Sequence, residues 1–402
     1  MRDLQISERG LEMPSSPIRK LAPLAYAAED NGVRIYRLNI GQPDLPTPQK
    51  ALDSLKHINR STLEYSPSQG FRSLRLKLVE YYSRFNIQLS PNDIIITNGG
   101  SEAVLFAFMS TLNPGDEIIV SEPAYANYMA FAVSAGAVIR TVTTTIDEGF
   151  CLPKVEKFEE LINEKTRAIL ICNPNNPTGY LYNQNEMLQI RDIVKKHNLY
   201  LFSDEVYREF IYTGSPYISA MHLEGIENNV ILIDSVSKRY SECGIRIGAL
   251  VTRNEKVRQT VMKFCQARLS PPLIGQIVAE ASIEGTADYS RQVYDEYLER
   301  RKVLIDGVNK IPGCYTPIPM GAFYTVAQLP VDDTEKFCAW CLTDFCYENE
   351  TIMMAPAEGF YSTPGMGKNE VRLAYVLNKK DLKRALFLLE KALEQYKQLN
   401  ND

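Results

Sequence analysis

The central part of the chain alternates short apolar runs with longer segments of helical period. The apolar runs are rich in Val and Ile, and helical patterns separate them, most clearly at residues 102–112 and 186–197. Nearly continuous apolar strands that alternate with helices are typical of a parallel sheet covered on both faces. The strands predicted in this way are 94–97, 117–121, 138–142, 168–172, 200–203, 230–234 and 248–251.

A second, smaller unit follows this region. Residues 289–310 show a long charged helical pattern, which we expect to bridge the two units. Beyond it, strand patterns at 322–326 and 371–375 mix with helical patterns at 334–348 and 380–395. This mixture is typical of an α+β unit.

These patterns predict an α/β protein with three parts. Residues 46–288 form a large domain with a mostly parallel seven-stranded sheet flanked by helices, and residues 289–402 form a smaller α+β domain. Residues 1–45 show no strand pattern, so we expect them to pack on the small domain or on a partner subunit. In a chain of 402 residues, the cleft between two such domains is the default ligand site.

Composition and charge narrow the range of functions. The formal net charge of -5 and the pI near 5.6 argue against a nucleic-acid partner, because such proteins usually carry a basic face. The first twenty residues contain no apolar signal segment, and no run approaches the ~18 to 20 apolar residues that a membrane span needs. We therefore expect a cytoplasmic protein that acts on a small molecule, with no membrane partner.

Cysteines and histidines do not indicate a metal site. Cys338, Cys341 and Cys346 include a C-x-x-C spacing, but a zinc site needs four ligands and the histidines are remote in sequence. We interpret these cysteines as one face of an amphipathic helix, and the thiols in general as reduced.

Polar motifs follow the carboxyl ends of several predicted strands, where open parallel sheets bind ligands. Gly100 and Ser101 open a helix whose N–H groups face an anion, although a glycine pair there is also ordinary turn chemistry. Residues 173–179, NPNNPTG, form a rigid loop that can direct one Asn amide to a ligand or simply turn the chain. Asp204 ends another strand, either as a buried carboxylate that needs a positive partner or as a helix cap.

A lysine motif completes this series. Ser235-Val236-Ser237-Lys238 follows the strand at 230–234 and precedes the segment GIRIG, which contains Arg246. Burial or a neighbouring cation lowers the pKa of a lysine amine and makes it nucleophilic towards an aldehyde. No G-x-G-x-x-G follows the first strand, so a dinucleotide-binding dehydrogenase is not expected.

The motif S-x-S-K followed by G-x-R-x-G resembles the cofactor-lysine signature of the class I and II aminotransferases, which are fold type I enzymes dependent on pyridoxal 5'-phosphate. The resemblance runs from about Gly41 to Arg372 through GQPDLPTP, YSPSQGFRSLR, EPAYANY, NPNNPTG, SDEVY and NEVRLAY, in the family's order. It implies the fold type I architecture, pyridoxal phosphate as cofactor and a homodimer with shared active sites. In length and N-terminal pattern the chain most resembles the aspartate aminotransferases.

The resemblance implies a role for each residue around the cofactor ring. Lys238 carries the cofactor as a Schiff base and transfers the proton between substrate and cofactor. Asp204 pairs with the pyridine nitrogen and keeps the ring electron-withdrawing. Asn176 and Tyr207 donate to the ring hydroxyl, and Tyr125 stacks on the ring.

The resemblance also implies how the phosphate and the substrate are bound. The expected phosphate ligands are Gly100, Ser101, Ser235, Ser237 and Arg246, with Tyr65 reaching the phosphate of the neighbouring subunit. The expected substrate-binding residues are Arg372, which grips the α-carboxylate, together with Gly41, Asn176 and Ile40.

The distal part of the substrate site stays open. Ser15, Ser16 and Arg268 are candidates for it, and Arg268 is equally well interpreted as a surface charge. Many aspartate aminotransferases carry a lysine after the glycine pair, where this chain has Ser101.

We expect a ping-pong aminotransferase that moves the amino group of an L-amino acid to a 2-oxo acid. Aspartate with 2-oxoglutarate is the working hypothesis, and alanine or aromatic amino acids are the close alternatives. A pyridoxal-phosphate-dependent β-lyase and a non-catalytic binding module are alternatives of other classes, since fold alone does not decide chemistry.

Overall fold

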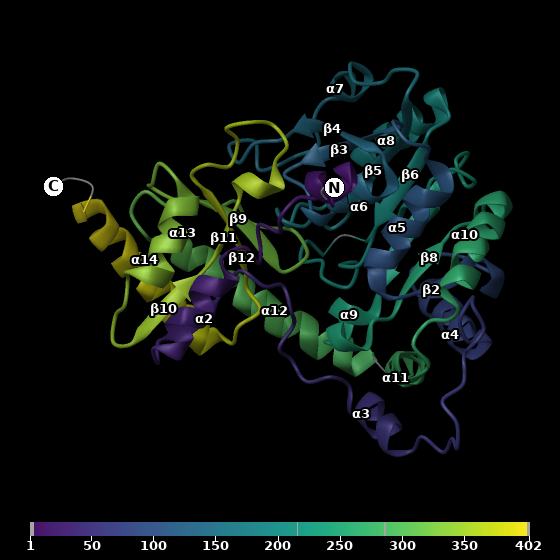
Figure 1. Cartoon of the computed structure of the whole chain (residues 1–402), viewed down its shortest axis with the longest axis horizontal. Helices are drawn as coiled ribbons and strands as arrows, with labels where there is room; N and C mark the ends of the chain where they lie inside the picture. The colour runs from purple at the N-terminus through teal and green to yellow at the C-terminus, as the bar shows by residue number, and fades with distance from the viewer. Residues whose placement is uncertain (1–3, 215, 285–286, 400–402) are drawn as a thin grey trace.

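The computed structural model describes residues 4–214, 216–284 and 287–399. Figure 1 shows two lobes, with a large sheet in one and small sheets in the other. The long helix α12 (Ala287–Val308) extends from the larger lobe towards the smaller one, along the lower side of the molecule in this view.

A seven-stranded sheet forms the centre of the larger lobe, in the order β2-β8-β7-β6-β5-β3-β4. Neighbouring strands are parallel, except that β8 is antiparallel to β2 and β7. The predicted α/β class with a mostly parallel sheet is therefore confirmed, and each predicted strand is present with its ends shifted by at most two residues. The strands are β2 (Ile94–Thr97), β3 (Glu117–Glu122), β4 (Val138–Thr143), β5 (Thr166–Cys172), β6 (Tyr200–Asp204), β7 (Val230–Ser235) and β8 (Gly248–Val251).

The two faces of this sheet bury two separate apolar cores. On β5, Ala168 and Leu170 face one core while Ile169 and Ile171 face the other, because successive side chains of a strand point to opposite faces. Apolar helices cover both faces, so the strands are apolar throughout. The first core is covered by α5 (Gly99–Thr111), α6 (Asn127–Ala135) and α10 (Glu255–Arg268), and the second by α4 (Arg72–Ser83), α8 (Gln184–His197) and α11 (Leu273–Ile283).

The smaller lobe is built on a three-stranded antiparallel sheet in the order β11-β12-β9. Its strand β9 begins two residues after the predicted start, because Gly321 bridges to Ile211 and Ala322 takes a positive φ of 57°. The sheet packs with helices α13 and α14 around the core that contains Phe337 and Leu389. The elements are β9 (Tyr324–Gln328), α13 (Thr334–Thr343), β11 (Ala355–Pro356), β12 (Glu370–Ala374) and α14 (Lys379–Leu399).

The predicted helix at 334–348 is too long. Helix α13 ends at Thr343, and Glu348 and Asn349 take positive φ values that turn the chain into β10 (Glu350–Met353). Cys338 and Cys341 are buried on α13, but Cys346 lies beyond the helix and is exposed, so the prediction of a single helical face was wrong for that residue. Across the described ranges, no group of three or more His, Cys, Asp or Glu side chains is placed to hold a metal.

The N-terminal stretch contributes a strand that its sequence did not reveal. Strand β1 (Arg34–Arg37) pairs in parallel with β10, and helix α2 (Ala22–Asp30) precedes it. Leu21, Ala25, Tyr36 and Leu38 lie in the same apolar core as β9 and β12. A four-residue strand with only one buried side chain shows no clear alternation, which explains the omission.

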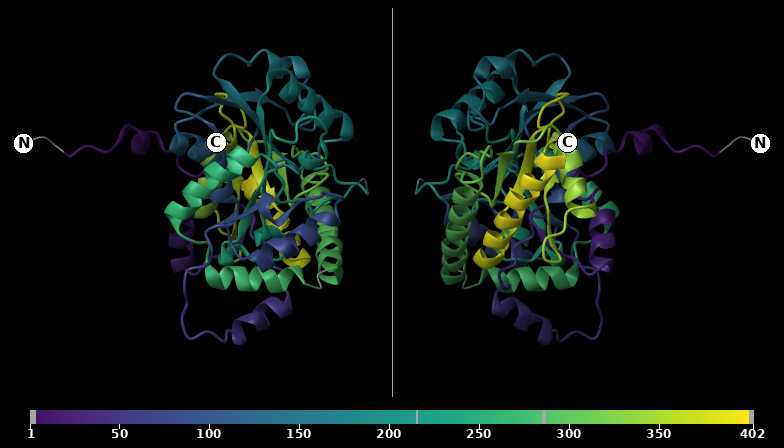
Figure 2. Two further views of the ribbon diagram at one scale, coloured as in Figure 1. Left: turned by 90° about the vertical axis from the view of Figure 1, so that its right-hand side faces the viewer. Right: turned by 90° about the vertical axis from the view of Figure 1, so that its left-hand side faces the viewer.

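Two segments project from the body of the molecule. In Figure 2 the N-terminal arm with α1 (Glu8–Glu12) extends to one side, and α3 (Gln49–Lys56) with its flanking segments lies below the larger lobe. None of the described helices is long and apolar enough to cross a membrane. The remaining short helices are η1 (Pro91–Asp93), α7 (Val155–Glu159), η2 (Ala220–His222), α9 (Val236–Arg239), η3 (Cys243–Ile245) and η4 (Glu358–Phe360).

Glycine at position 248 is required by the close approach of β8 to the start of α5. A Cβ atom there would lie 2.4 Å from the carbonyl carbon of Gly99 and 2.7 Å from both the oxygen of Asp234 and the nitrogen of Gly100. We expect Gly248→Ala to lower the free energy of unfolding by about 1–3 kcal/mol, since all three contacts are backbone. Gly244→Ala, which meets nothing within 4 Å, is the control in thermal unfolding. Equal melting temperatures for the two variants would contradict this reading.

Candidate active site

A cavity of about 710 Å³ lies beyond the carboxyl ends of the parallel strands, with walls from both lobes and from the N-terminal stretch. It brings together most of the residues that the sequence predicted, which come from strand ends, helix starts and loops far apart in the chain. The predicted residues that line it are Ser16, Ile40, Gly41, Gly100, Ser101, Tyr125, Asn176, Asp204, Tyr207, Ser235, Ser237, Lys238, Arg246 and Arg372.

Lys238 lies on the short helix α9, directly after the carboxyl end of β7. Its amine donates to the carbonyl of Gly41 at 3.0 Å and lies 3.9 Å from the sulfur of Cys243. Burial lowers the pKa of the amine, and the positive charges of Arg372 and Arg246 lower it further. A Cβ at Gly41 would lie 1.6 Å from the hydroxyl oxygen of Tyr324, so only glycine lets the chain pass this close to the amine.

Asp204 ends β6 with a buried carboxylate. It accepts from the Tyr128 hydroxyl at 2.6 Å and from the N–H of Val206 at 3.3 Å, and the described residues supply no ion pair to it. Burial raises the pKa of this carboxyl to about 6, although both hydrogen bonds oppose the shift. The site therefore holds a carboxylate that a cation would stabilise.

A cluster of hydroxyl and amide groups lies beside it. The amide of Asn176 donates to the hydroxyl of Tyr207 at 3.3 Å, and the hydroxyls of Tyr207 and Tyr324 lie 3.1 Å apart. Tyr125 stands edge-on to Tyr128, with ring centroids 5.3 Å apart. The cluster offers donors and an aromatic edge to a flat ligand.

Donors for an anion converge on another part of the cavity. Helix α5 begins at Gly99, and its first N–H groups are unpaired within the helix. The hydroxyl of Ser235 donates to that of Ser237 at 2.9 Å, just before Lys238. The guanidinium of Arg246 is exposed and donates to the carbonyls of Cys243 and Asn98 at 2.9 and 3.4 Å.

Arg372 lies on β12 of the smaller lobe with its side chain fully buried. It donates to the amide oxygen of Asn176 at 3.2 Å and to the carbonyl of Asn39. Its Nε atom is buried without a partner among the described residues. Burial lowers the pKa of this guanidinium. A buried donor without a partner is costly, so a carboxylate ligand would stabilise this arrangement.

Three predicted residues lie outside the cavity. Tyr65 is 76% exposed, on the segment between α3 and α4. Ser15 is exposed on the N-terminal stretch. Arg268 pairs with Glu102 at 2.5 Å and donates to the carbonyl of Ser68 at 2.9 Å, so its charge is engaged in this single chain.

Several lining residues were missed by sequence reasoning. Tyr324, Arg19 and Cys243 belong to none of the quoted motifs and come into contact with the site only through the fold, and Tyr128 ends the motif EPAYANY without having been assigned a role. Tyr128 was detectable in principle, since it lies three residues after Tyr125 and therefore on the same face of the turn that begins α6.

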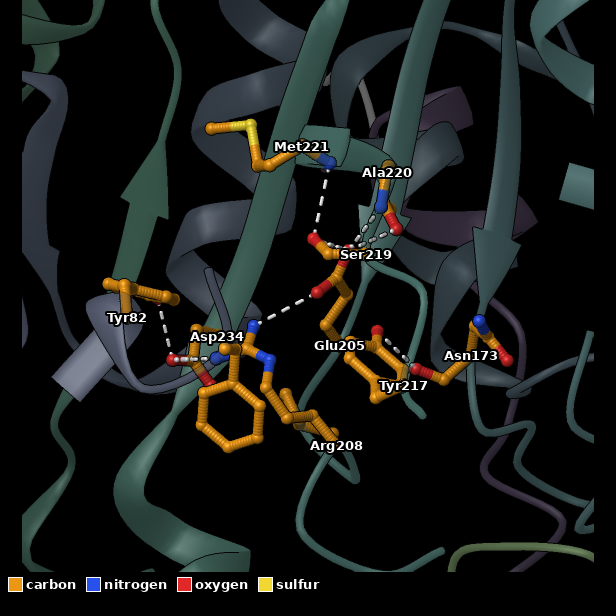
Figure 3. A network of polar contacts seen from close by, with 12 residues as sticks. Tyr82, Asn173, Glu205, Arg208, Tyr217, Ser219, Ala220, Met221 and Asp234 are labelled. Atoms are coloured by element: carbon orange, nitrogen blue, oxygen red, sulfur yellow. Dashed lines mark hydrogen bonds and ion pairs between the residues drawn. The ribbon is translucent and has the colours of Figure 1, made fainter. Parts of the chain in front are cut away.

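A buried network of charged side chains stabilises the segment that carries Lys238. Figure 3 shows Arg208 between Glu205 and Asp234, at 3.1 and 3.3 Å. Asp234 also accepts from the Tyr82 hydroxyl, from Arg239 and from the N–H of Ser235, which caps α9. Burial alone would raise the pKa of Asp234, but Arg239 and Arg208 outweigh it and lower the pKa to about 2.

Comparison with known proteins agrees with this architecture. The aspartate aminotransferase of Pyrococcus horikoshii is 31% identical over an alignment of 401 residues that covers 97% of each chain. The crystal structure of aspartate aminotransferase from Thermotoga maritima matches with a TM-score of 0.88 at 28% identity, covering 97% of this chain and 100% of that one. An alanine aminotransferase structure from Pyrococcus furiosus matches with the same score, identity and coverage.

The fold is thus that of the fold type I aminotransferases. The sequence profile described as aminotransferase class I and II matches residues 33–387, and the chain belongs to this family. The protein is therefore an aminotransferase, as its motifs predict, and neither the β-lyase nor the non-catalytic alternative is favoured.

Removing the charge of Asp234 tests the supporting network. Asp234→Asn leaves Arg208 and Arg239 without their shared carboxylate, and we expect the free energy of unfolding at pH 7 to fall by about 3–5 kcal/mol. The folded-state pKa of about 2 lies below the ordinary value of 3.8, so this contribution is present at neutral pH and is lost as the pH falls from about 4 through 2.

Urea unfolding of wild type and variant between pH 2 and 7 measures both effects. Asp192→Asn, which removes an exposed carboxylate paired with Arg191, should leave the unfolding free energy unchanged. A deficit in Asp234→Asn that stays constant down to pH 2 would show that the pKa of Asp234 is not lowered.

Proposed function

We propose that this aminotransferase uses pyridoxal 5'-phosphate bound through Lys238. The observation that carries the proposal is the meeting, in one cavity, of a buried amine, a buried carboxylate without a cation and a set of donors for an anion. In the protein alone, each of these groups is energetically unfavourable or has no ligand. The amine matches the aldehyde of the cofactor, the carboxylate matches its ring nitrogen, and the donors match its phosphate.

The residues present fit the cofactor. Asp204 lacks a positive partner, and a protonated pyridine nitrogen supplies one. The start of α5 at Gly100 and Ser101, together with Ser235, Ser237 and Arg246, offers N–H, hydroxyl and guanidinium donors suited to a phosphate dianion. Asn176 and Tyr207 are placed to bind the ring hydroxyl, and Tyr125 to lie against the ring.

In the proposed mechanism, the bound cofactor supplies an electron sink for the carbanion that forms when the substrate Cα–H bond breaks. Lys238 moves the proton as general base and acid, which its lowered pKa favours at neutral pH. The hydrogen bond from Asn176 to Tyr207 holds these two side chains in place. Asp204 keeps a negative charge at the buried end of the site, where it would compensate the positive ring nitrogen of the cofactor.

Arg372 is proposed to bind the α-carboxylate of both the amino acid and the 2-oxo acid. Its position is fixed by Asn176 and Asn39, and the unpaired Nε leaves a donor for the carboxylate. Holding the carboxylate fixes the direction of the Cα–H bond, which is the orientation effect that this chemistry needs. Gly41 and Ile40 line the same part of the cavity.

The charges around the cavity favour a dicarboxylic substrate. Among the described lining residues the charged ones are Arg19, Asp204, Lys238, Arg246 and Arg372. The cofactor and the α-carboxylate account for the last four, and Arg19 is left over. Its guanidinium has no ion pair within the described chain, and it lies close enough to Tyr125 to lower the pKa of that hydroxyl against the raising effect of burial.

Arg19 is therefore the proposed partner of a distal carboxylate, and aspartate with 2-oxoglutarate is the proposed substrate pair. Arg268, one of the candidates that the sequence offered for this task, pairs with Glu102 outside the cavity. With an alanine or aromatic substrate the exposed guanidinium of Arg19 would have no carboxylate to bind.

A homodimer with shared active sites is also proposed. Tyr65, Leu63 and Leu55 are exposed apolar side chains on the projecting segment around α3, a distribution that fits an intersubunit surface. In such a dimer Tyr65 would reach the phosphate site of the partner. The protein is proposed to act in the cytoplasm on amino acids and 2-oxo acids.

Lys238→Ala tests the cofactor proposal. We expect the wild-type protein to absorb visible light after pyridoxal phosphate is added, and borohydride reduction followed by peptide mapping to place the adduct on residue 238. The variant should form no adduct there and should lose at least about 10²-fold in transamination rate. Lys154→Ala, an exposed lysine outside the cavity, is the control. An adduct on another lysine, or pyruvate and ammonia released without a 2-oxo acid, would contradict the proposal.

Arg19→Gln tests the substrate proposal. We expect KM for aspartate and 2-oxoglutarate to rise about tenfold, the effect of losing one charge-assisted hydrogen bond at a partly exposed site. KM for alanine should stay within a factor of about two, because alanine has no distal carboxylate. The same measurements on Arg268→Gln serve as the comparison, and a selective loss in that variant instead would transfer the role to Arg268.

A further inference from the structure

A loop of the smaller lobe is fastened to the end of β3 in the larger lobe. The carboxylate of Glu122, buried at 1% exposure, accepts from the N–H groups of Ser362 and Thr363 at 2.6 and 3.3 Å through one oxygen. The hydroxyl of Thr143 donates to its other oxygen at 2.8 Å. The loop thus completes the hydrogen bonding of a carboxylate that belongs to the other lobe.

Further contacts hold the same junction. The N–H of Ala124 donates to the carbonyl of Phe360 at 2.9 Å, and the hydroxyls of Thr143 and Thr363 lie 3.2 Å apart. A small apolar core joins the lobes beside it, with Ala126 from the larger lobe and Phe360 from the smaller. The described part of the chain gives Glu122 no ion pair, so its charge is stabilised by these uncharged donors.

The fastened loop carries a side chain that packs on the substrate-binding arginine. The ring of Phe360 is buried and lies 5.1 Å from the guanidinium carbon of Arg372, on which the ring of Tyr324 also packs at 4.6 Å. The guanidinium thus packs against two aromatic rings. A loop that moved away from Glu122 would remove one of them.

We propose that Glu122 is a positioning residue for substrate binding, which fastens the loop at residues 358–363 and so holds Phe360 against Arg372. The proposal rests on Arg372 as the carboxylate-binding residue of the proposed function. Charge-assisted hydrogen bonds from backbone N–H groups are stronger than neutral ones, and here they form only when the two lobes are in contact. The geometry of the carboxylate grip is therefore coupled to the position of the smaller lobe.

Two variants weaken the fastening to different degrees. Glu122→Ala removes all three accepted bonds, whereas Thr143→Val removes one donor and keeps the carboxylate. In hydrogen exchange followed by mass spectrometry, we expect the peptide containing Ser362 and Thr363 to exchange faster in both variants, and more so in Glu122→Ala. Glu117→Gln, at the start of the same strand, should leave that peptide unchanged. Unchanged exchange in Thr143→Val and Glu122→Ala would overturn the proposal.

Kinetics distinguish positioning from a general loss of structure. We expect KM for the amino acid to rise about tenfold in Glu122→Ala, while kcat at saturation and the cofactor's absorbance stay within a factor of about two of wild type. If Glu122 acts through the loop, adding Glu122→Ala to Phe360→Leu should raise KM no further than the more affected single variant. Additive effects would overturn the proposal, as would a fall in kcat without a change in KM.

Arg372→Lys distinguishes the positioning role of Glu122 from the carboxylate-binding role of Arg372 on which it rests. A raised KM in Arg372→Lys together with unchanged KM in Glu122→Ala overturns the positioning role alone. An unchanged KM in Arg372→Lys overturns the carboxylate-binding role of Arg372, and the positioning role with it.

Discussion

Asp204 ends a central strand with its carboxylate buried, and among the described residues only the Tyr128 hydroxyl and the N–H of Val206 donate to it. A buried charge in this condition is costly, as its raised pKa of about 6 reflects. The parallel sheet directs the ends of β6 and β7 into one cavity that also contains Lys238. The proposed cofactor would supply the missing positive charge there. The proposed catalytic chemistry depends on this unpaired carboxylate.

Two neighbouring acidic residues, Asp234 and Glu205, differ from Asp204 because each forms an ion pair. Glu205 directly follows Asp204 and Asp234 lies on the neighbouring strand β7, yet Arg208 and Arg239 pair with them and hold the pKa of Asp234 low. These charges are therefore used to fix α9 and the lysine that it carries. Asp204 is therefore available to a ligand, whereas the carboxylates of Asp234 and Glu205 stabilise the fold. Arg372 reaches the same cavity from the smaller lobe.

The sequence predicted the large sheet well because its strands are buried on both faces and flanked by clear turns. Lys238, Asp204, Asn176 and Arg372 were found because each belongs to a motif, and the structure brings all four to one cavity. Strand β1 was missed because one buried side chain in four gives no periodic signal. Arg19 and Glu122 were missed because their relevance depends on contacts between segments far apart in the chain, which no local pattern encodes. Arg268 was one candidate for the distal site, and the sequence does not reveal its pairing with Glu102.

The central claim is that the carboxylate at the end of β6 keeps a ring nitrogen positively charged. It is tested most directly by the ¹⁵N chemical shift of pyridoxal phosphate labelled at the ring nitrogen and bound to the wild-type protein. The account predicts the shift of a protonated pyridine nitrogen throughout the range from pH 6 to pH 9. A shift typical of a neutral pyridine across this range would contradict it.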